Sequence, residues 1–154
     1  MNKLERIDRQ ILNELQNNGR LSNVELSNRV GLSESACLRR VKNLEASGII
    51  DKYVALIDQE KIGLPSNVFV RVSLERQQEE QLKGFEKAVA EVPEVMACYF
   101  MSGDVDFLML VAVHDPTDYE RVHNHLTRLP GVARVHSSFA LRTVFKRNIL
   151  PLKN

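Results

Sequence analysis

The sequence predicts an α+β protein built in two parts, and three observations support this. Up to about residue 48, apolar side chains recur at three- and four-residue steps, which is typical of amphipathic helices. From Ile49 onward, short apolar stretches replace that period and indicate strands mixed with helices. The phrases VPEV and LPGV, which begin at Val92 and Leu129, fall at matching places between a helix and a strand. We therefore expect a repeated βαβ unit in the second part.

Three helices are expected in the first part. The first places Leu4, Ile7, Ile11 and Leu15 on one face and stops at the Asn-Asn-Gly stretch 17–19. Three helices this short bury little surface singly, so their apolar faces must share one core. The chain up to residue 50 is therefore expected to be one small helical domain.

The ends of the second and third helices can be placed from capping residues. Ser22 and Glu25 form a capping box at the start of the second helix, which ends at Gly31. The third begins after Ser33 as N-cap and ends at Gly48. Its inward face is expected to contain Cys37, Leu38, Val41 and Leu44. The short turn at Gly31 predicts a helix-turn-helix domain, winged-helix-like, over residues 1–50.

The second part alternates strands and helices. The expected strands are 68–72, 96–101, 107–113 and 133–145, and the expected helices are 81–91 and 117–128. Two βαβ units predict a ferredoxin-like βαββαβ domain over residues 67–154, joined to the helices by an extended linker at 51–66. With both helices on one sheet face, the other face needs cover. Apolar residues expected to supply it are Phe69, Phe100, Phe107, Leu108, Leu110 and Phe139, which predicts subunit pairing.

Composition narrows the class of protein. The chain has 154 residues, 44% hydrophobic and 27% charged, with a formal net charge of +1. No apolar run is long enough to cross a membrane, and the N-terminus lacks the apolar core of a signal peptide. Cys37 and Cys98 have no metal-type spacing. We expect a cytoplasmic protein with reduced thiols, no metal and no cofactor, and no contact with membranes.

The third helix is the candidate DNA-reading element. Its outward positions are Ser35, Ala36, Arg39, Arg40, Lys42 and Asn43. Guanidinium groups bind phosphate or guanine, small residues let the helix approach a groove, and amides near Ser33 add a positive dipole end. Arg20, before the second helix, is either a DNA-backbone contact or a solvated charge. A solvated helix offset by Glu34 and Glu45 is the alternative for the whole face, but the helix-turn-helix context favours double-stranded DNA.

The phrase SGDVDF, residues 102–107, joins two expected strands. As a plain hairpin turn it needs no function, because Gly and Asp tolerate tight turns. Two carboxylates beside a glycine can also hold an ammonium group while free amides accept a carboxylate. Ser137 and Ser138 are weaker candidates for the same ligand, since the polar face of a strand explains them equally well.

Two other classes of protein compete with a DNA-binding regulator. His114, His123, His125 and His136 are the candidates for acid–base or metal chemistry, but they have no recognisable partner spacing. No phosphate loop, nucleophile elbow or zinc-protease motif occurs. A stand-alone sensor or scaffold would not need the basic helix. We therefore expect a protein that is not an enzyme.

The chain resembles the leucine-responsive/asparagine regulator (Lrp/AsnC) family over nearly its whole length. The matching phrases are NGRLS, VGLSES, RRVKNLE, SGII and SGDVDF in fixed order. The resemblance implies a transcriptional regulator that forms dimers through the second domain, often assembles into an octamer built of dimers, and often responds to a small amino-acid ligand. It also implies that Gly103, Asp104 and Asp106, with Met101 nearby, line the effector pocket. Some proteins of similar architecture are haem-precursor decarboxylases, which is the enzyme alternative.

Overall fold

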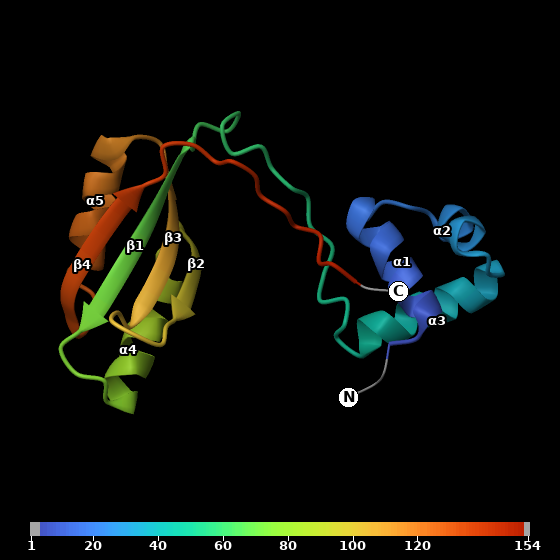
Figure 1. Cartoon of the computed structure of the whole chain (residues 1–154), viewed down its shortest axis with the longest axis horizontal. Helices are drawn as coiled ribbons and strands as arrows, with labels where there is room; N and C mark the ends of the chain where they lie inside the picture. The colour runs from blue at the N-terminus through green and yellow to red at the C-terminus, as the bar shows by residue number, and fades with distance from the viewer. Residues whose placement is uncertain (1–3, 153–154) are drawn as a thin grey trace. The chain divides into compact units, whose positions relative to one another are not determined.

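The computed structural model describes residues 4–152, which form two compact units (Figure 1). One unit contains the chain up to Leu56 together with the chain from Val144, and the other contains Ile57–Thr143. The outer ends of the two predicted domain ranges, residues 1–3 and 153–154, lie outside the described residues. Residues 67–154 were predicted as one domain, whereas the chain from Val144 onward contacts the first unit.

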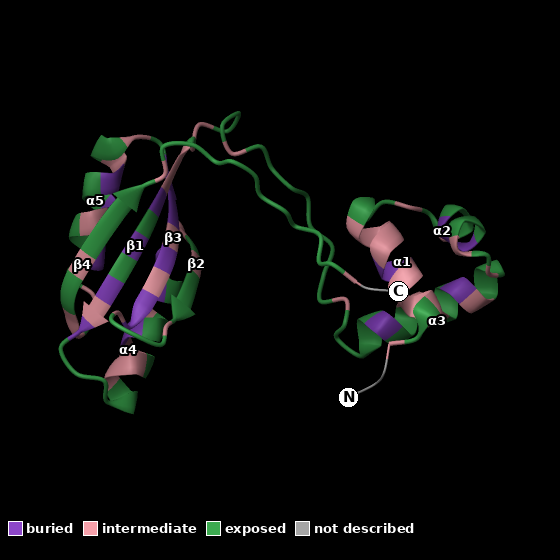
Figure 2. Ribbon diagram, in the orientation of Figure 1, coloured by how far each residue is buried: buried purple, intermediate pink, exposed green. Residues whose placement is uncertain are grey.

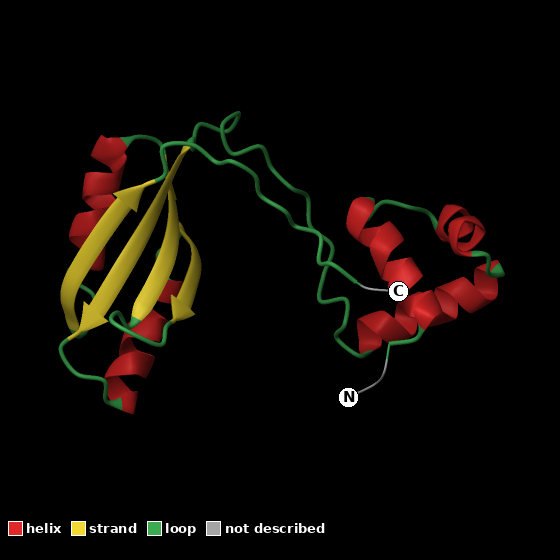
Figure 3. Cartoon of the chain, viewed as in Figure 1, coloured by secondary structure: helices red, strands yellow, loops and turns green. Residues whose placement is uncertain are grey.

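The first unit has three helices: α1 (Arg6–Asn17), α2 (Asn23–Val30) and α3 (Glu34–Ala46) (Figure 3). Their shared core consists of Ile11, Leu12, Leu26, Cys37 and Leu44. Burial raises the pKa of the Cys37 thiol, which fits a packing role for this side chain. The described part of this unit contains no strand, so the apolar stretch after Ile50 is irregular chain.

The turn between α2 and α3 is fixed by local hydrogen bonds. Ser22 and Glu25 form the expected capping box, and Gly31 ends α2 with φ of 70°, a conformation that glycine adopts without strain. The Asn23 side-chain amide donates to the Glu34 carbonyl at 2.8 Å. This bond joins the first turns of α2 and α3, so it sets the direction in which α3 leaves the turn.

One expected core residue of α3 is not in the core. Leu38 is 43% exposed, whereas Cys37 is fully buried and Leu44 nearly so. Successive helical positions are about 100° apart, so a residue at the edge of an apolar stripe can lie on either side of the boundary. The inward placement of Leu38 was wrong.

The second unit is a four-stranded sheet with two helices. Its elements are β1 (Ser66–Leu74), α4 (Glu79–Ala90), β2 (Val95–Phe100), β3 (Phe107–Val113), α5 (Pro116–Leu126) and β4 (Val132–Phe139). The strand order is β2-β3-β1-β4, and all neighbouring pairs are antiparallel. This confirms the predicted ferredoxin-like topology. The last strand ends at Phe139, six residues before its predicted end.

Both helices cover the same face of the sheet (Figure 3). β1 alternates between buried and exposed positions, as Figure 2 shows. The core between sheet and helices includes Val68, Val70, Val72, Phe85, Phe107, Met109, Val111, Val122 and Leu126. The opposite face carries Phe69, which pairs with Leu110 across β3 and with Ser138 across β4.

Three of the six apolar residues expected on the open face lie on the helix side instead. Phe107 is 1% exposed, and its ring centroid lies 5.3 Å from that of Phe100. The Phe139 ring packs edge-on against Tyr119 of α5 at 5.2 Å. Strand alternation explains the difference, because residues paired with buried neighbours share their face. The open face keeps Phe69, Leu108 and Leu110 and adds Tyr99.

The C-terminal segment, from Val144 onward, packs against the helices of the first unit. The Gln16 side chain of α1 holds the backbone of Leu150 twice: its amide donates to the carbonyl at 3.2 Å, and its oxygen accepts from the Leu150 amide at 2.7 Å. Leu152 then packs against the core of the three helices. The helical unit therefore includes residues from both ends of the described chain.

Replacing Leu152 with alanine is expected to destabilise the helical unit by about 1–2 kcal/mol, because it removes apolar surface from a partly exposed site. Leu150→Ala is the matched control, since that side chain is 69% exposed and its backbone bonds remain. The free energies of unfolding of both variants would be measured by urea denaturation. Equal losses for the two variants would contradict the packing role of Leu152.

Candidate DNA-binding surface and effector loop

The outward face of α3 carries exposed positive charge. Arg39, Lys42 and Asn43 are exposed, and no ion pair within residues 4–152 involves either cation. Ser33 is the N-cap, and its hydroxyl accepts from the Ala36 amide at 3.3 Å. Ser35 is exposed in the same first turn. The face thus combines small residues at its N-terminal end with two exposed cations, Arg39 about one turn and Lys42 about two turns later, a combination suited to phosphates and base edges.

Arg40 differs from the other predicted DNA contacts. Its guanidinium donates to Asp8 and to Glu5, both at 2.9 Å, and its side chain is 30% exposed. These bonds, the one to Asp8 first, raise the pKa of Arg40. Arg40 therefore joins α3 to the start of α1, and in the free protein its charge is already neutralised.

Arg20 lies in the turn before α2. Its side chain is exposed, and its backbone amide donates to the Asn18 side chain at 3.0 Å. The structure places it on a different segment from α3, with no partner for its charge among the ion pairs of residues 4–152. It can contact the DNA backbone or remain solvated.

The SGDVDF loop joins β2 to β3 and is organised by Asp106. This carboxylate is 5% exposed and accepts from the Leu74 amide and from the Gln77 side chain, both at 2.7 Å. Gly103 has φ of 119°, which favours glycine. Asp104 is exposed and Met101 half-buried. Within one chain, Asp104 is thus the carboxylate of this loop that is open to a ligand.

Ser137 and Ser138 lie far along the sheet from this loop. They belong to β4, at the opposite edge from β2. The Ser137 hydroxyl hydrogen-bonds to the Tyr119 hydroxyl of α5, and Ser138 lies opposite Phe69 on the open face. One chain does not bring these serines to the SGDVDF loop, so a shared pocket would need a second subunit.

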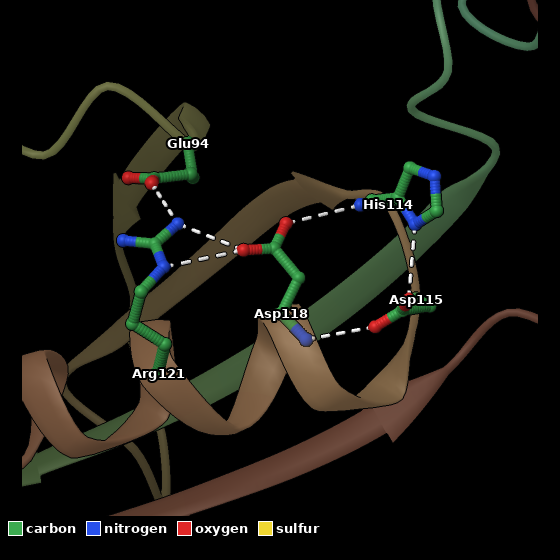
Figure 4. Close-up of polar contacts among 5 residues, drawn as sticks. All are labelled: Glu94, His114, Asp115, Asp118 and Arg121. Carbon is green, nitrogen blue, oxygen red and sulfur yellow. Dashed lines mark hydrogen bonds and ion pairs between the residues drawn. The ribbon is translucent and has the colours of Figure 1, made fainter.

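An ionic cluster connects the first turns of α5 to the residue before β2 and to the residue after β3 (Figure 4). Arg121 donates to Glu94 and Asp118, and Asp118 accepts from the backbone amide of His114 at 3.1 Å. Asp115 caps α5 by accepting from the Asp118 amide at 2.8 Å. Arg121 lowers the pKa of Glu94, whereas the His114 amide, followed by Arg121, lowers that of Asp118. All of these groups have local structural partners.

The pH dependence of stability tests this cluster. Because the folded-state pKa values of Glu94 and Asp118 are lowered, their stabilisation is present above the unfolded values of 4.5 and 3.8 and is lost as the pH falls through the folded values. Arg121→Ala is expected to flatten this acid-side loss in the melting temperature. Lys83→Ala, which removes an exposed pair with Glu79 on α4, is the control. An unchanged acid slope in Arg121→Ala would refute the assignment.

Sequence reasoning missed two parts of these sites. Asp106 accepts hydrogen bonds from Leu74 and Gln77, which lie about 30 residues before it in the chain, and no local sequence signal links them to it. Leu38 was assigned to the core although it is exposed beside the reading residues. The periodicity of α3 contained that option, since Leu38 lies at the edge of the apolar stripe. Among residues 4–152, no group of three or more His, Cys, Asp and Glu side chains is arranged to hold a metal.

Comparison with known proteins identifies both units. Residues 67–150 match the Lrp/AsnC ligand binding domain, and residues 4–51 match a winged helix-turn-helix DNA-binding domain. The chain belongs to the Lrp/AsnC family. It is thus a transcriptional regulator of that family, with an N-terminal DNA-binding domain and a C-terminal ligand-binding domain.

Relatives of this Lrp/AsnC regulator match over nearly its whole length. The Bkd operon transcriptional regulator of Pseudomonas aeruginosa is 43% identical, with 99% of this chain and 100% of the relative covered. The leucine-responsive regulatory protein of Escherichia coli is 42% identical, with 97% and 92% covered. A Neisseria meningitidis transcriptional regulator, solved as a complex with L-Met, has a TM-score of 0.91 at 39% identity, with 97% of each chain covered. No described helix of this regulator is both long and apolar enough to cross a membrane.

Proposed function

We propose that this regulator reads specific double-stranded DNA with α3. The observation that carries this assignment is the exposed face of Ser35, Arg39, Lys42 and Asn43, whose two cations have no ion-pair partner within residues 4–152. Ser33 and Ala36 bring the N-terminus of the helix to the groove, and Arg20 is proposed as a backbone contact. Arg40 acts by holding α3 on α1, and it reaches DNA only if it exchanges Asp8 for phosphate.

The test is selection of bound duplexes from a random-sequence pool by the full chain. We expect enrichment of a sequence with two half-sites, because a two-fold dimer presents two α3 helices. Equal binding of selected and unselected duplexes would refute specific recognition. The affinity should fall as the salt concentration rises, because contacts with DNA phosphates release counterions.

We further propose that a small amino acid is the effector and that it binds at the SGDVDF loop. The similar Neisseria regulator was solved with L-Met, and in this chain Asp104 and Gly103 are exposed in that loop. Asp104 would pair with the ligand ammonium group, while Asp106 holds the loop and Met101 lies next to it. Ser137 and Ser138 would contribute only from a neighbouring subunit.

A thermal-shift screen of the twenty amino acids tests the effector proposal. A ligand that prefers the folded state raises the melting temperature, and Asp104→Ala should abolish that rise. Glu75→Ala, an exposed carboxylate near the end of β1, is the control. A shift that survives Asp104→Ala would place the ligand elsewhere.

We propose that the open sheet face pairs two copies of the chain and that the dimers assemble into an octamer. Phe69 and Tyr99 are 45% and 59% exposed on this face, with Leu108 and Leu110 between them. Such an apolar surface favours a closed, symmetric contact. A monomer in light scattering at micromolar concentration would contradict this proposal.

Enzymatic activity is the second candidate, and we propose that it is absent. His114 interacts with Asp115 at the start of α5, and His123 lies beside the Tyr119 ring at 5.9 Å. His114 therefore has a local ion-pair partner, which lessens the case for acid–base chemistry there, whereas Nδ1 of His123 is buried without a hydrogen-bond partner among residues 4–152. We propose a cytoplasmic location, where DNA is accessible. Decarboxylation of a haem precursor by the purified chain would overturn this reading.

A further inference from the structure

We propose that Leu38 is a specificity-determining residue that contacts the 5-methyl group of a thymine in the major groove. This inference rests on the proposed reading of DNA by α3. It concerns a large apolar side chain, whereas the residues of α3 proposed above to meet the groove are small, polar or charged. Leu38 is 43% exposed, and it is the one large apolar side chain of α3 that is exposed.

The position of Leu38 on the helix points outward. Ser35 lies three positions before it and Lys42 four positions after it, so the three residues form one row along the helix surface. Ser35 and Lys42 are both exposed, and Arg39 adjoins the row. The other large apolar residues of α3, Val41 and Leu44, contact the core of the helical unit. Leu38 therefore belongs to the reading face.

The chemistry of the groove selects the partner. Base edges in the major groove present hydrogen-bond donors and acceptors, and the thymine methyl is the apolar group among them. An exposed leucine gains little from phosphates or from polar base edges. It gains from burying its own methyl groups against another apolar group. Leu38 in the row between Ser35 and Lys42 would meet a base edge while Arg39 and Lys42 bind phosphate or guanine.

Replacing a thymidine with deoxyuridine tests the proposed methyl contact directly, because the two nucleosides differ only in the 5-methyl group of the base. A duplex selected by the full-length wild-type protein is remade with one thymine at a time changed to deoxyuridine. Dissociation constants are then measured by fluorescence anisotropy at one salt concentration. We expect at least one thymine where wild type loses about three- to fivefold in affinity, the effect of roughly one buried methyl group.

The same series with Leu38→Ala should show no loss at that thymine. Ile49→Ala, an apolar residue of similar exposure (40%) beyond the end of α3, is the matched control and should keep the wild-type sensitivity. Leu38→Met, which keeps an apolar side chain, should keep it as well. Circular dichroism and melting temperature check that each variant is folded.

The outcomes separate this inference from the DNA-binding proposal. Wild-type sensitivity to deoxyuridine that is lost in Leu38→Ala and kept in Leu38→Met supports the inference. The inference is overturned if the wild-type protein binds its selected duplex but no thymine-to-deoxyuridine change weakens the binding. It is also overturned if Leu38→Ala loses as much affinity as wild type at the sensitive thymine. Both outcomes leave the DNA-binding proposal intact. If Leu38→Ala does not fold, Leu38→Gln replaces it under the same criterion. If no duplex is enriched, the DNA-binding proposal fails and this inference fails with it.

Discussion

Replacing Arg39 and Lys42 together with alanine is expected to weaken binding of the selected duplex by roughly 30- to 1,000-fold, or about 2–4 kcal/mol. Both side chains are exposed on α3, and neither has an ion-pair partner within residues 4–152. Their loss is therefore expected to remove contacts with DNA without breaking an ion pair among these residues. The affinity would be measured by gel-shift titration at several salt concentrations, where the slope of log affinity against log salt should also fall.

The control for this double variant is Lys83→Ala with Lys87→Ala. These lysines lie on α4 of the other unit, so the control removes the same net charge from a surface with no proposed DNA contact. We expect it to bind the duplex as wild type does, with only a small change from the long-range field. Equal weakening in both double variants would show that net charge, and not α3, governs the affinity.

Arg40→Ala should behave differently from Arg39→Ala. Removing Arg40 takes the guanidinium away from Asp8 and Glu5 and so breaks the ion pairs that join α3 to the start of α1. Arg40→Ala is therefore expected to lower the melting temperature of the helical unit, whereas Arg39→Ala should leave it unchanged. Comparing the two melting curves separates loss of a DNA contact from loss of the helix that carries it.

Asp106→Ala is expected to destabilise the sheet unit by about 2–4 kcal/mol. The variant leaves the Leu74 amide without its acceptor in a buried site and removes the partner of Gln77. Asp104→Ala is the matched control in the same loop, and because that side chain is exposed its effect on stability should stay within about 0.5 kcal/mol. Urea unfolding of the sheet unit measures both.

Asp106 and Asp104 thus have different roles in one loop: Asp106 stabilises it, and Asp104 is the proposed ligand contact. We expect Asp106→Asn to lie between wild type and Asp106→Ala, because the amide oxygen can still accept from the Leu74 amide. If Asp106→Ala and Asp104→Ala unfolded alike, the structural role assigned to Asp106 would be wrong. If Asp106→Ala kept full stability yet lost its amino-acid response, Asp106 would be a ligand contact instead.

Much of the fold is predictable from the sequence because its signals are local. The capping box at Ser22 and Glu25 and the glycine at position 31 place the ends of α2 within a residue or two. The repeated phrases at Val92 and Leu129 predict the two βαβ units, which the strand order confirms. Capping and repeats depend on neighbouring residues, and these are visible in one chain.

The remaining features depend on contacts between distant residues. Arg40 looks like any outward cation until α1 places Asp8 and Glu5 beside it, 32 and 35 positions away. Asp106 looks like a turn residue until β1 brings Leu74 to it. The C-terminal segment has no apolar period, and its place on α1 depends on Gln16, 134 positions earlier. Sequence spacing carries no information about such encounters.

The order in which the chain is synthesised gives the docking of Leu152 a further meaning. Translation proceeds from the N-terminus, and domains generally fold as they emerge. The helical unit, however, takes part of its apolar contact from Leu152, which emerges only after the whole sheet unit has been made. The DNA-binding unit is therefore completed only after the sheet unit. We expect the helical unit, which contains α3, to reach its full stability only once the sheet unit and Leu152 have been synthesised. A fragment that ends before the sheet unit would therefore be less stable in the cell than the full chain.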